Sequence, residues 1–158
     1  TAFKVDSYKI KPVELDLNTL IKSTVKSLDE KISEKNISIK YNFENTKASK
    51  CSADEYLLTI CLKEIIDNAI KYSDKHTTIT INSSVPRNRI LIEVIDEGPG
   101  FPEIVLKNLF KTFITDTDMT KQGLGLDLVL VYLIMKAHNG SIDIKNNDLH
   151  GATVSLLI

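Results

Sequence analysis

The sequence of 158 residues is poor in the residues that mark several common protein classes. It has no tryptophan, six glycines, four prolines and two cysteines, and it contains no internal repeat or low-complexity linker. Neither Cys51 nor Cys61 has a second cysteine or a histidine at metal-ligand spacing, so we expect no zinc site and no disulfide framework. These absences indicate one ordinary globular domain in a reducing compartment.

The chain also lacks an excess of charge and a long hydrophobic run. Its 20 Lys and Arg residues balance 21 Asp and Glu residues, a formal net charge of −1, so we expect no nucleic-acid binding. Its longest apolar run, Leu128 to Met135, is far shorter than the roughly 20 residues that span a bilayer. We therefore expect no membrane contact by this chain and a cytoplasmic location. The start at Thr1, without Met or a signal core, predicts a piece of a longer protein, for which a membrane anchor stays open.

Apolar residues at helical spacing predict three main helices. The helices are expected over residues 17–36, 54–73 and 124–138. Asp16 is the expected cap of the first, and Asn139-Gly140 is expected to end the third with a left-handed cap. The connection over residues 96–123 holds only a short helical piece, and a connection of that length is typically functional.

Alternation and β-branched residues predict short strands. They are expected over residues 37–43, 48–52, 77–84, 89–95, 141–145 and 152–157. The segment 48–52 is expected to pair with 37–43, and the next two strands to form a hairpin through Pro86-Arg87-Asn88. The mixture predicts an α+β fold, a two-layer α/β sandwich whose mixed, mostly antiparallel sheet of about five strands is covered on one face by three helices.

One face of the second helix combines four kinds of polar group. Glu64, Asn68, Lys71 and Tyr72 lie at i, i+4, i+7 and i+8, so their side chains leave the helix on one side. Glu64 and Asn68 offer oxygen ligands for a hard cation, Lys71 offers an ammonium for phosphate, and Tyr72 offers a ring that can stack on a base. Together these groups suit a magnesium nucleotide. The alternative is a solvated helix face.

Two glycine-containing segments are further candidates. Asp96 ends an apolar strand before Gly98 and Gly100, where its carboxylate can accept a hydrogen bond from an exocyclic amine; an ordinary Asp turn is the alternative. Gly123-Leu124-Gly125-Leu126 enters the third helix, whose N-terminal amides suit a phosphate; an empty glycine loop is the alternative. Neither segment matches a P-loop or a dinucleotide fingerprint, so these classes are excluded.

The other candidate residues carry weaker signals. The histidines His76, His138 and His150 have no acidic or serine partner at a recognisable spacing, which favours surface or capping roles. Phe110 lies in an apolar stripe that packing explains, and Thr153 lies in a terminal strand, where threonine is a common β-former.

In this order, the segments resemble the ATP-binding catalytic domain of sensor histidine kinases, in the superfamily that also holds DNA gyrase, heat-shock chaperone ATPases and mismatch-repair ATPases. Residues 64–73 (EIIDNAIKYS) resemble the N box, 96–100 (DEGPG) the first glycine box, 109–113 (LFKTF) the F box and 123–126 (GLGL) the second glycine box. The resemblance covers residues 12–158, and it implies that residues 1–11 link to a phosphoacceptor helical domain absent from the chain.

The resemblance implies ATP and Mg²⁺ as cofactors and a role for each matching residue. Asp96 would read the adenine amino group, Asn68 would ligate magnesium and Lys71 would meet the phosphates. Residues 101–122 would form a mobile lid. The implied ATP-binding residues are Asn68, Lys71, Tyr72, Asp96, Gly98, Gly100, Phe110, Lys121, Gly123, Leu124, Gly125, Leu126 and, through water, Thr153. The implied catalytic residues are Lys71 and Glu64, the latter acting on magnesium through water or on the acceptor histidine.

Three positions depart from the family pattern. Glu64 stands where sensor kinases often have Asn, Lys121 where the second glycine box usually begins with Gly, and Thr115 where a basic residue often follows the F box. Lys121 either supplies the missing charge or leaves a lid that closes poorly. The change Lys121→Gly separates these readings, because activity falls only if the lysine replaces lost chemistry.

The resemblance predicts an ATP-dependent protein-histidine kinase domain of a two-component system. No histidine of the chain stands in an H box, so the expected partners are a phosphoacceptor histidine domain of the same longer protein and a response regulator. One alternative is an anti-sigma-type serine kinase of the same fold, which Glu64 with Asn68 would suit. Another is a nucleotide-binding regulatory module without transfer activity. Without dimerisation helices, this fragment is expected to be a monomer.

Overall fold

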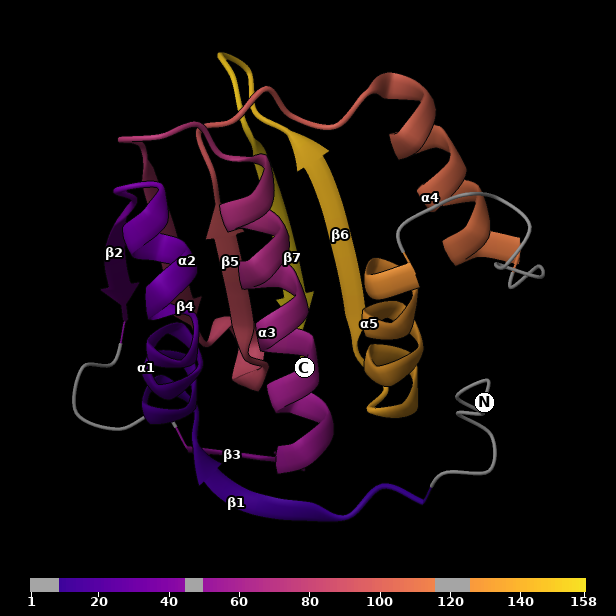
Figure 1. Ribbon diagram of the computed structural model, residues 1–158. Helices are drawn as coiled ribbons and strands as arrows, with labels where there is room; N and C mark the ends of the chain where they lie inside the picture. The colour runs from indigo at the N-terminus through magenta and orange to yellow at the C-terminus, as the bar shows by residue number, and fades with distance from the viewer. Residues whose placement is uncertain (1–8, 45–49, 116–125) are drawn as a thin grey trace.

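A five-stranded sheet and a layer of helices on one of its faces form the two layers of the molecule (Figure 1). The computed structural model describes residues 9–44, 50–115 and 126–158. Across the sheet the strands follow the order β2-β4-β5-β7-β6, and a separate pair, β1 with β3, lies at the lower end. The predicted α+β sandwich is confirmed.

The sheet is mixed and mostly antiparallel, as predicted. Its strands are β2 (Ser38–Phe43), β4 (Thr78–Ser84), β5 (Leu91–Ile95), β6 (Ser141–Asn146) and β7 (Ala152–Leu157). Strands β4 and β5 form the expected hairpin, whose turn at Pro86–Asn88 places Arg87 at a φ of 54°. Strands β2 and β4 run parallel, so the connections that enter them lie side by side at one end of the sheet.

The small sheet corrects two sequence predictions. Strand β1 (Pro12–Asp16), which was not expected, pairs antiparallel with β3 (Lys50–Asp54). The predicted pairing of the segment 48–52 with residues 37–43 is wrong, because β2 pairs with β4 instead. Strand β3 leads directly into a helix at the lower end of the molecule, and its alternate residues Cys51 and Ala53 are buried in the core there, beside β1.

The helices of the described residues are α1 (Leu17–Ser27), α2 (Asp29–Glu34), α3 (Glu55–Tyr72), α4 (Glu103–Thr115) and α5 (Leu126–Ala137). Helices α3 and α5 confirm their predictions, and α4 is the short helix expected between residues 96 and 123. The single helix expected over residues 17–36 is wrong, since the chain bends at Leu28 with φ −107° and ψ 11°. Leu28 is buried there, and its N–H bonds the carbonyls of Val25 and Lys26, which ends α1.

The hydrophobic core lies between the sheet and helices α1, α3 and α5. The largest fully buried side chains are Leu17, Ile21, Leu57, Leu58, Leu62, Ile65, Ile66, Ile79, Ile81, Ile92, Ile134 and Met135. Burial of each such side chain contributes about 1.5–3 kcal/mol relative to exposure. Helix α3 supplies five of these twelve residues along its length, so it is a rigid support for polar groups at its ends.

Side chains tie the start of α3 to the end of α5. The carboxylate of Asp54 caps α3 by accepting from the N–H of Leu57 at 3.1 Å. The N–H of Asp54 donates to Nε2 of His138 at 3.1 Å, and Nδ1 of His138 contacts the carbonyl of Ile134 at 2.9 Å. The expected left-handed cap is confirmed at Asn139, whose φ is 56°.

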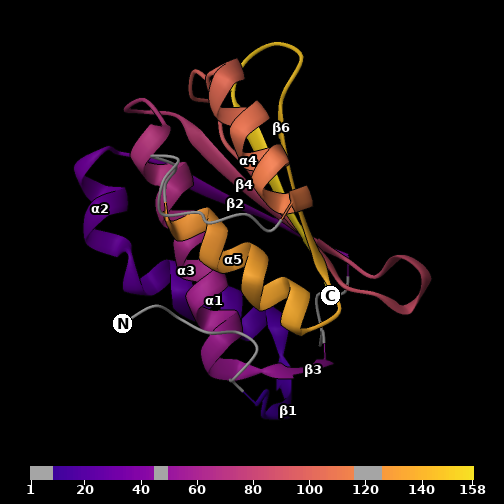
Figure 2. The same cartoon turned by 90° about the vertical axis from the view of Figure 1, so that its right-hand side faces the viewer.

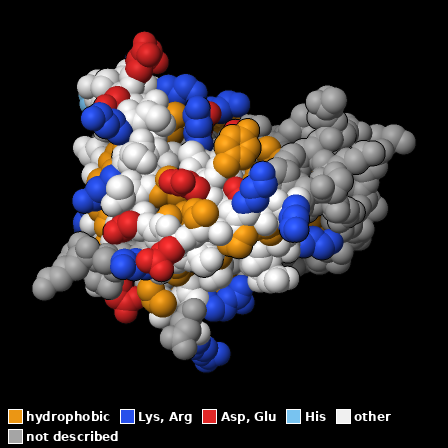
Figure 3. Space-filling view, turned by 90° about the horizontal axis from the view of Figure 1, so that it is seen from below, with side chains coloured by type: hydrophobic (Ala, Val, Ile, Leu, Met, Phe, Trp, Pro, Cys, Tyr) orange, Lys and Arg blue, Asp and Glu red, His pale blue; other side chains and the backbone are white. Residues whose placement is uncertain are grey.

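The surface of the described residues, seen from below, carries no continuous patch of one charge, because basic, acidic and apolar side chains are interspersed on it (Figure 3). Among the described helices, none has the length and hydrophobicity that crossing a membrane requires.

Candidate functional site

A cavity of about 230 Å³ opens between α3, the sheet and the start of α4. It is lined by Ile65, Asn68, Ala69, Lys71 and Tyr72 of α3, Val94 of β5, Asp96, Gly100, Phe101 and Pro102 of the following segment, Val105 and Leu109 of α4, Leu128 of α5, and Ala152 and Val154 of β7. Helix α4 lies above α5 on the same side of the molecule, and the two helices are in contact (Figure 2). Mostly apolar walls with a few polar groups are typical of small-molecule sites.

Asp96 is the buried carboxylate of the cavity, with 7% of its surface exposed. Its Oδ1 accepts from the N–H of Gly98 at 3.0 Å and from the N–H of Ala152 at 3.2 Å. Within the described part of the chain, Oδ2 accepts no hydrogen bond. Burial raises the pKa of Asp96, and the two backbone hydrogen bonds oppose that rise. A fixed carboxylate with one oxygen left over is a selective acceptor for an amine of a ligand.

Two glycines allow the backbone to close around Asp96. A Cβ at Gly98 would clash with the carbonyl oxygen of Tyr72, so only glycine lets this loop pack against the end of α3. A Cβ at Gly151, whose φ is +86°, would clash with the carbonyl of Asp96. The loop after β5, the end of α3 and the β6–β7 turn are therefore packed backbone to backbone.

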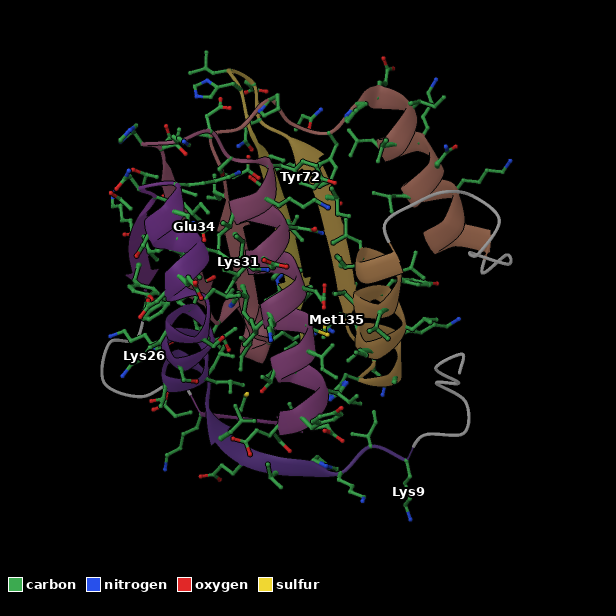
Figure 4. The ribbon with its side chains drawn as sticks, viewed as in Figure 1. Lys9, Lys26, Lys31, Glu34, Tyr72 and Met135 are labelled. Carbon is green, nitrogen blue, oxygen red and sulfur yellow. The ribbon has the colours of Figure 1, made fainter. Side chains whose placement is uncertain are left out.

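The last turn of α3 supplies a cation and an aromatic ring at the rim of the cavity. Nζ of Lys71 lies 5.5 Å from the centroid of the Tyr72 ring, which is itself half exposed at the upper end of α3 (Figure 4). The Tyr72 and Phe101 rings lie 6.2 Å apart between centroids, tilted by 53°. This rim offers a flat apolar contact next to a positive charge, a combination that suits a base carrying phosphates.

The structure brings together five of the residues expected from the sequence. Asn68, Lys71, Tyr72, Asp96 and Gly100 all line the cavity. They come from two segments that lie far apart in the sequence, the end of α3 and the loop after β5. Their convergence favours a ligand over the alternatives of a solvated helix face and an ordinary turn.

Other expected residues lie elsewhere. Glu64 is half-buried on α3 and Gly98 is buried beside Asp96, and neither lines the cavity. Thr153 does not reach it either, because Ala152 and Val154 line the cavity and strand alternation turns Thr153 to the other face of the sheet. The Thr153 hydroxyl donates instead to Oδ1 of Asn147 at 2.6 Å.

Several expected residues lie outside the described part of the structure. They are Lys121, Gly123, Leu124 and Gly125, together with the side chains of Phe110, Thr115 and Leu126. The backbone of Leu126 begins α5.

Sequence reasoning missed most of the apolar lining and two polar residues beside it. Phe101, Val105, Ala152 and Val154 follow the same apolar patterns as core residues, so no sequence signal separated them from the core. The polar residues are Asn146, which bonds the backbone of Phe101, and Lys35, which bonds the end of α3. Both depend on contacts between distant segments and had no local signal.

The described site lies within the part of the chain that matches a known family model. The model described as "Histidine kinase-, DNA gyrase B-, and HSP90-like ATPase" matches residues 53–158. Sensor protein KdpD of Clostridium acetobutylicum is 34% identical over 147 residues, which are 85% of this chain and 16% of that protein. Sporulation kinase C of Bacillus subtilis is 30% identical over 142 residues, 90% of this chain and 32% of that protein. The chain thus spans a third or less of these relatives.

Solved structures show the same fold. The catalytic domain of histidine kinase ThkA superposes with a TM-score of 0.80 at 25% identity, covering 94% of this chain and 96% of that one. ThkA in complex with the response regulator protein TrrA superposes with a TM-score of 0.77 at 26% identity, covering 94% of this chain and 42% of that one.

Proposed function

Because the chain belongs to the family of histidine kinase-, DNA gyrase B- and HSP90-like ATPases, we propose that it binds Mg-ATP and transfers the γ-phosphoryl group to a histidine of another domain. The chain is an ATPase domain of the histidine kinase type, and its relatives include sensor kinases of two-component systems. Residues 12–158 are the proposed catalytic domain and residues 1–11 the proposed linker from the phosphoacceptor helices.

The observation that carries the proposal is the position of Asp96. Its Oδ1 is occupied by two backbone N–H groups, which fixes the orientation of the carboxylate and leaves Oδ2 as an acceptor at the cavity. The amino group of adenine is a donor that matches this acceptor, and the Tyr72 ring bounds the same cavity from α3. The residues present therefore fit an adenine base.

The phosphate end of the nucleotide is assigned to α3. Lys71 is the proposed phosphate contact and Asn68, one turn earlier on the helix, the proposed oxygen ligand of magnesium. Glu64, a further turn back, is the proposed outer ligand through water. When bound, Mg²⁺ would neutralise phosphate charge and stabilise the charge that develops during transfer. The proposed contribution of this chain is positioning and electrostatic stabilisation.

The acceptor histidine is proposed to lie outside this chain. His138 is bonded through both ring nitrogens to backbone groups, so it is a structural residue. The proposed partners are the phosphoacceptor domain of the same longer protein and a response regulator, for which the solved complex of ThkA is the precedent. We propose a cytoplasmic position for this domain and a monomeric state for the fragment.

A titration with a fluorescent ATP analogue, with and without magnesium, tests the proposal. We expect saturable binding by the wild type, loss of binding in Asp96→Asn and loss of the magnesium effect in Asn68→Ala. Matched controls are Asp148→Asn and Asn42→Ala, which make the same changes at exposed positions away from the cavity. No binding by the wild type would overturn the proposal.

A transfer assay then separates the possible acceptors. The domain is incubated with ATP and its phosphoacceptor helices, and the product is exposed to acid. Phosphohistidine is labile to acid, whereas phosphoserine is stable. An acid-stable product would favour a serine kinase, and binding without any transfer would favour a regulatory module.

A further inference from the structure

Lys35 caps the C-terminal end of α3 although it belongs to a different segment, the connection from α2 to β2. Its ammonium donates to the carbonyl oxygens of Ile70 at 2.9 Å, Lys71 at 2.8 Å and Ser73 at 2.9 Å. The last carbonyls of a helix have no partner within the helix, and a tetrahedral ammonium offers three donors. One lysine thus satisfies three of these acceptors.

The parallel pairing of β2 with β4 explains this position. The connections into the two strands lie side by side, and the N–H of Ser38 donates to the carbonyl of Thr77 at 3.0 Å. The N–H of His76 donates to the carbonyl of Lys35 at 2.9 Å. Lys35 is therefore bonded through its side chain to the end of α3 and through its backbone to the segment that follows.

The acceptors taken by Lys35 are those that a lysine of the last turn ordinarily uses. Basic side chains near a helix C-terminus bond the final carbonyls of their own helix. The carbonyl of Ala69 is also taken, by the N–H and the hydroxyl of Ser73 at 3.1 and 2.6 Å. Within the described part of the chain, the Lys71 ammonium makes no hydrogen bond or ion pair, and it stays over the Tyr72 ring at the rim of the cavity.

We propose that Lys35 is a positioning residue that keeps Lys71 available to the nucleotide phosphates, by occupying the carbonyls that Lys71 would otherwise bind. The inference rests on the proposed function, in which Lys71 meets those phosphates. The two lysines at this end of α3 then have different roles. Lys35 bonds the backbone carbonyls, and Lys71 faces the ligand.

The test compares ligands with and without phosphates in the variant Lys35→Met. Removal of the ammonium frees three carbonyls, and Lys71 turns to them. We expect the affinity for ATP to fall about tenfold, the value of one charged hydrogen bond, while the affinity for adenosine stays within about twofold. Displacement of the fluorescent ATP analogue by ATP and by adenosine measures both. A loss of fold would weaken both ligands alike.

A double variant and two further variants sharpen the comparison. If Lys35 acts through Lys71, Lys35→Met with Lys71→Met binds ATP no more weakly than Lys71→Met alone. Lys31→Met is the matched control. Lys31 of α2 bonds the side chain of Asp67 at 2.9 Å and, among the described residues, no carbonyl, so the ratio of ATP to adenosine affinity should not change in this variant (Figure 4). Lys35→Gln keeps two hydrogen-bond donors without the charge. We expect its ratio of ATP to adenosine affinity to lie between those of the wild type and Lys35→Met. This variant keeps the test available even if Lys35→Met does not fold.

The outcomes separate this inference from the proposed function. Unchanged ATP affinity in Lys35→Met and Lys35→Gln, with weaker binding in Lys71→Met, would overturn the role of Lys35 and leave the ATP site intact. Equal losses for ATP and adenosine would reduce Lys35 to a purely structural residue and also overturn the inference. Failure of the wild type to bind ATP would instead overturn the proposed function.

Discussion

The side-chain amide of Asn146 bonds both backbone groups of Phe101. Its Oδ1 accepts from the N–H of Phe101 at 2.8 Å, and its Nδ2 donates to the carbonyl of Phe101 at 2.9 Å. The flipped amide would bring donor to donor and acceptor to acceptor, so the orientation is determined. The end of β6 thereby holds the segment that enters α4 and carries the Phe101 ring at the cavity.

We predict that Asn146→Ala loosens this segment. The two hydrogen bonds are exposed to solvent, so we expect a loss of only about 1 kcal/mol in the free energy of unfolding. The motion is measurable, because the chain has no tryptophan and Ile104, in the first turn of α4, is 68% exposed. In an Ile104→Trp background, Asn146→Ala should lower the fluorescence anisotropy. The control Asn42→Ala should leave it unchanged, and equal anisotropy in all three proteins would contradict the prediction.

We predict that His138→Ala destabilises the fold. The change removes the hydrogen bond from the N–H of Asp54, the residue before α3, to Nε2 of His138, and the loss of one partly buried hydrogen bond costs about 1 kcal/mol. Thermal unfolding measures the effect. His150→Ala, at an exposed position in the β6–β7 turn, should leave the melting temperature unchanged, and equal temperatures for the two variants would argue against the tie.

The sequence predicted those elements whose signals are local. Helix α3 combines a continuous apolar stripe with a cap at Asp54, the residue directly before it, so both signals are local in the sequence. Strand β1 has no such pattern, because Val13 is 47% exposed and Pro12 begins the strand. The break at Leu28 was hidden because Leu28 and Ile32 continue the apolar spacing across it. The pairing of β3 depends on where the chain must enter α3, which no local pattern records.

In the site, too, the residues with a local sequence signal were predicted and those that depend on distant contacts were not. Asp96 and the polar face of α3 were found because each is a short motif that brings its own chemistry. Lys35 is 35 to 38 residues from the carbonyls it bonds, and Asn146 is 45 residues from Phe101, so the topology alone joins them. Thr153 was assigned by resemblance to a motif, whereas strand alternation places its neighbours at the cavity.

We predict that Thr153→Val changes the stability of the fold, whereas its neighbour Ala152→Val changes the affinity for the nucleotide. Thr153→Val keeps the shape of a side chain that is 3% exposed and removes its hydrogen bond to Asn147, so stability should fall by about 1 kcal/mol with nucleotide affinity unchanged. Ala152→Val adds two methyl groups to the cavity wall and should weaken nucleotide binding. Calorimetric titration and thermal unfolding of both variants decide the point. Weaker nucleotide binding in Thr153→Val would show that Thr153 contributes to the site after all.

We predict that Asp96→Asn weakens recognition of adenine without harming the fold. Oδ1 of the asparagine keeps the bonds from Gly98 and Ala152, so its NH₂ group must stand where Oδ2 stood. A donor then meets the adenine amino group, and we expect ATP affinity to fall by about 10- to 100-fold, as for the loss of a charged hydrogen bond. Inosine triphosphate, which presents a carbonyl at the same position, should lose less. Equal losses for the two nucleotides would argue against direct contact with Asp96.

The stability of this variant should depend on pH in a defined direction. The pKa of Asp96 is raised by burial, so the folded state holds the proton more tightly than the unfolded state, and the ionised carboxylate costs stability above the folded-state pKa. Asp96→Asn removes that cost, so at neutral pH it should unfold at the same temperature as the wild type or higher. As the pH falls through the folded-state pKa, Asp96 becomes neutral and any advantage of the variant should shrink. Denaturant unfolding of both proteins over this range measures the difference, and an advantage that grows toward low pH would show that the carboxylate stabilises the fold.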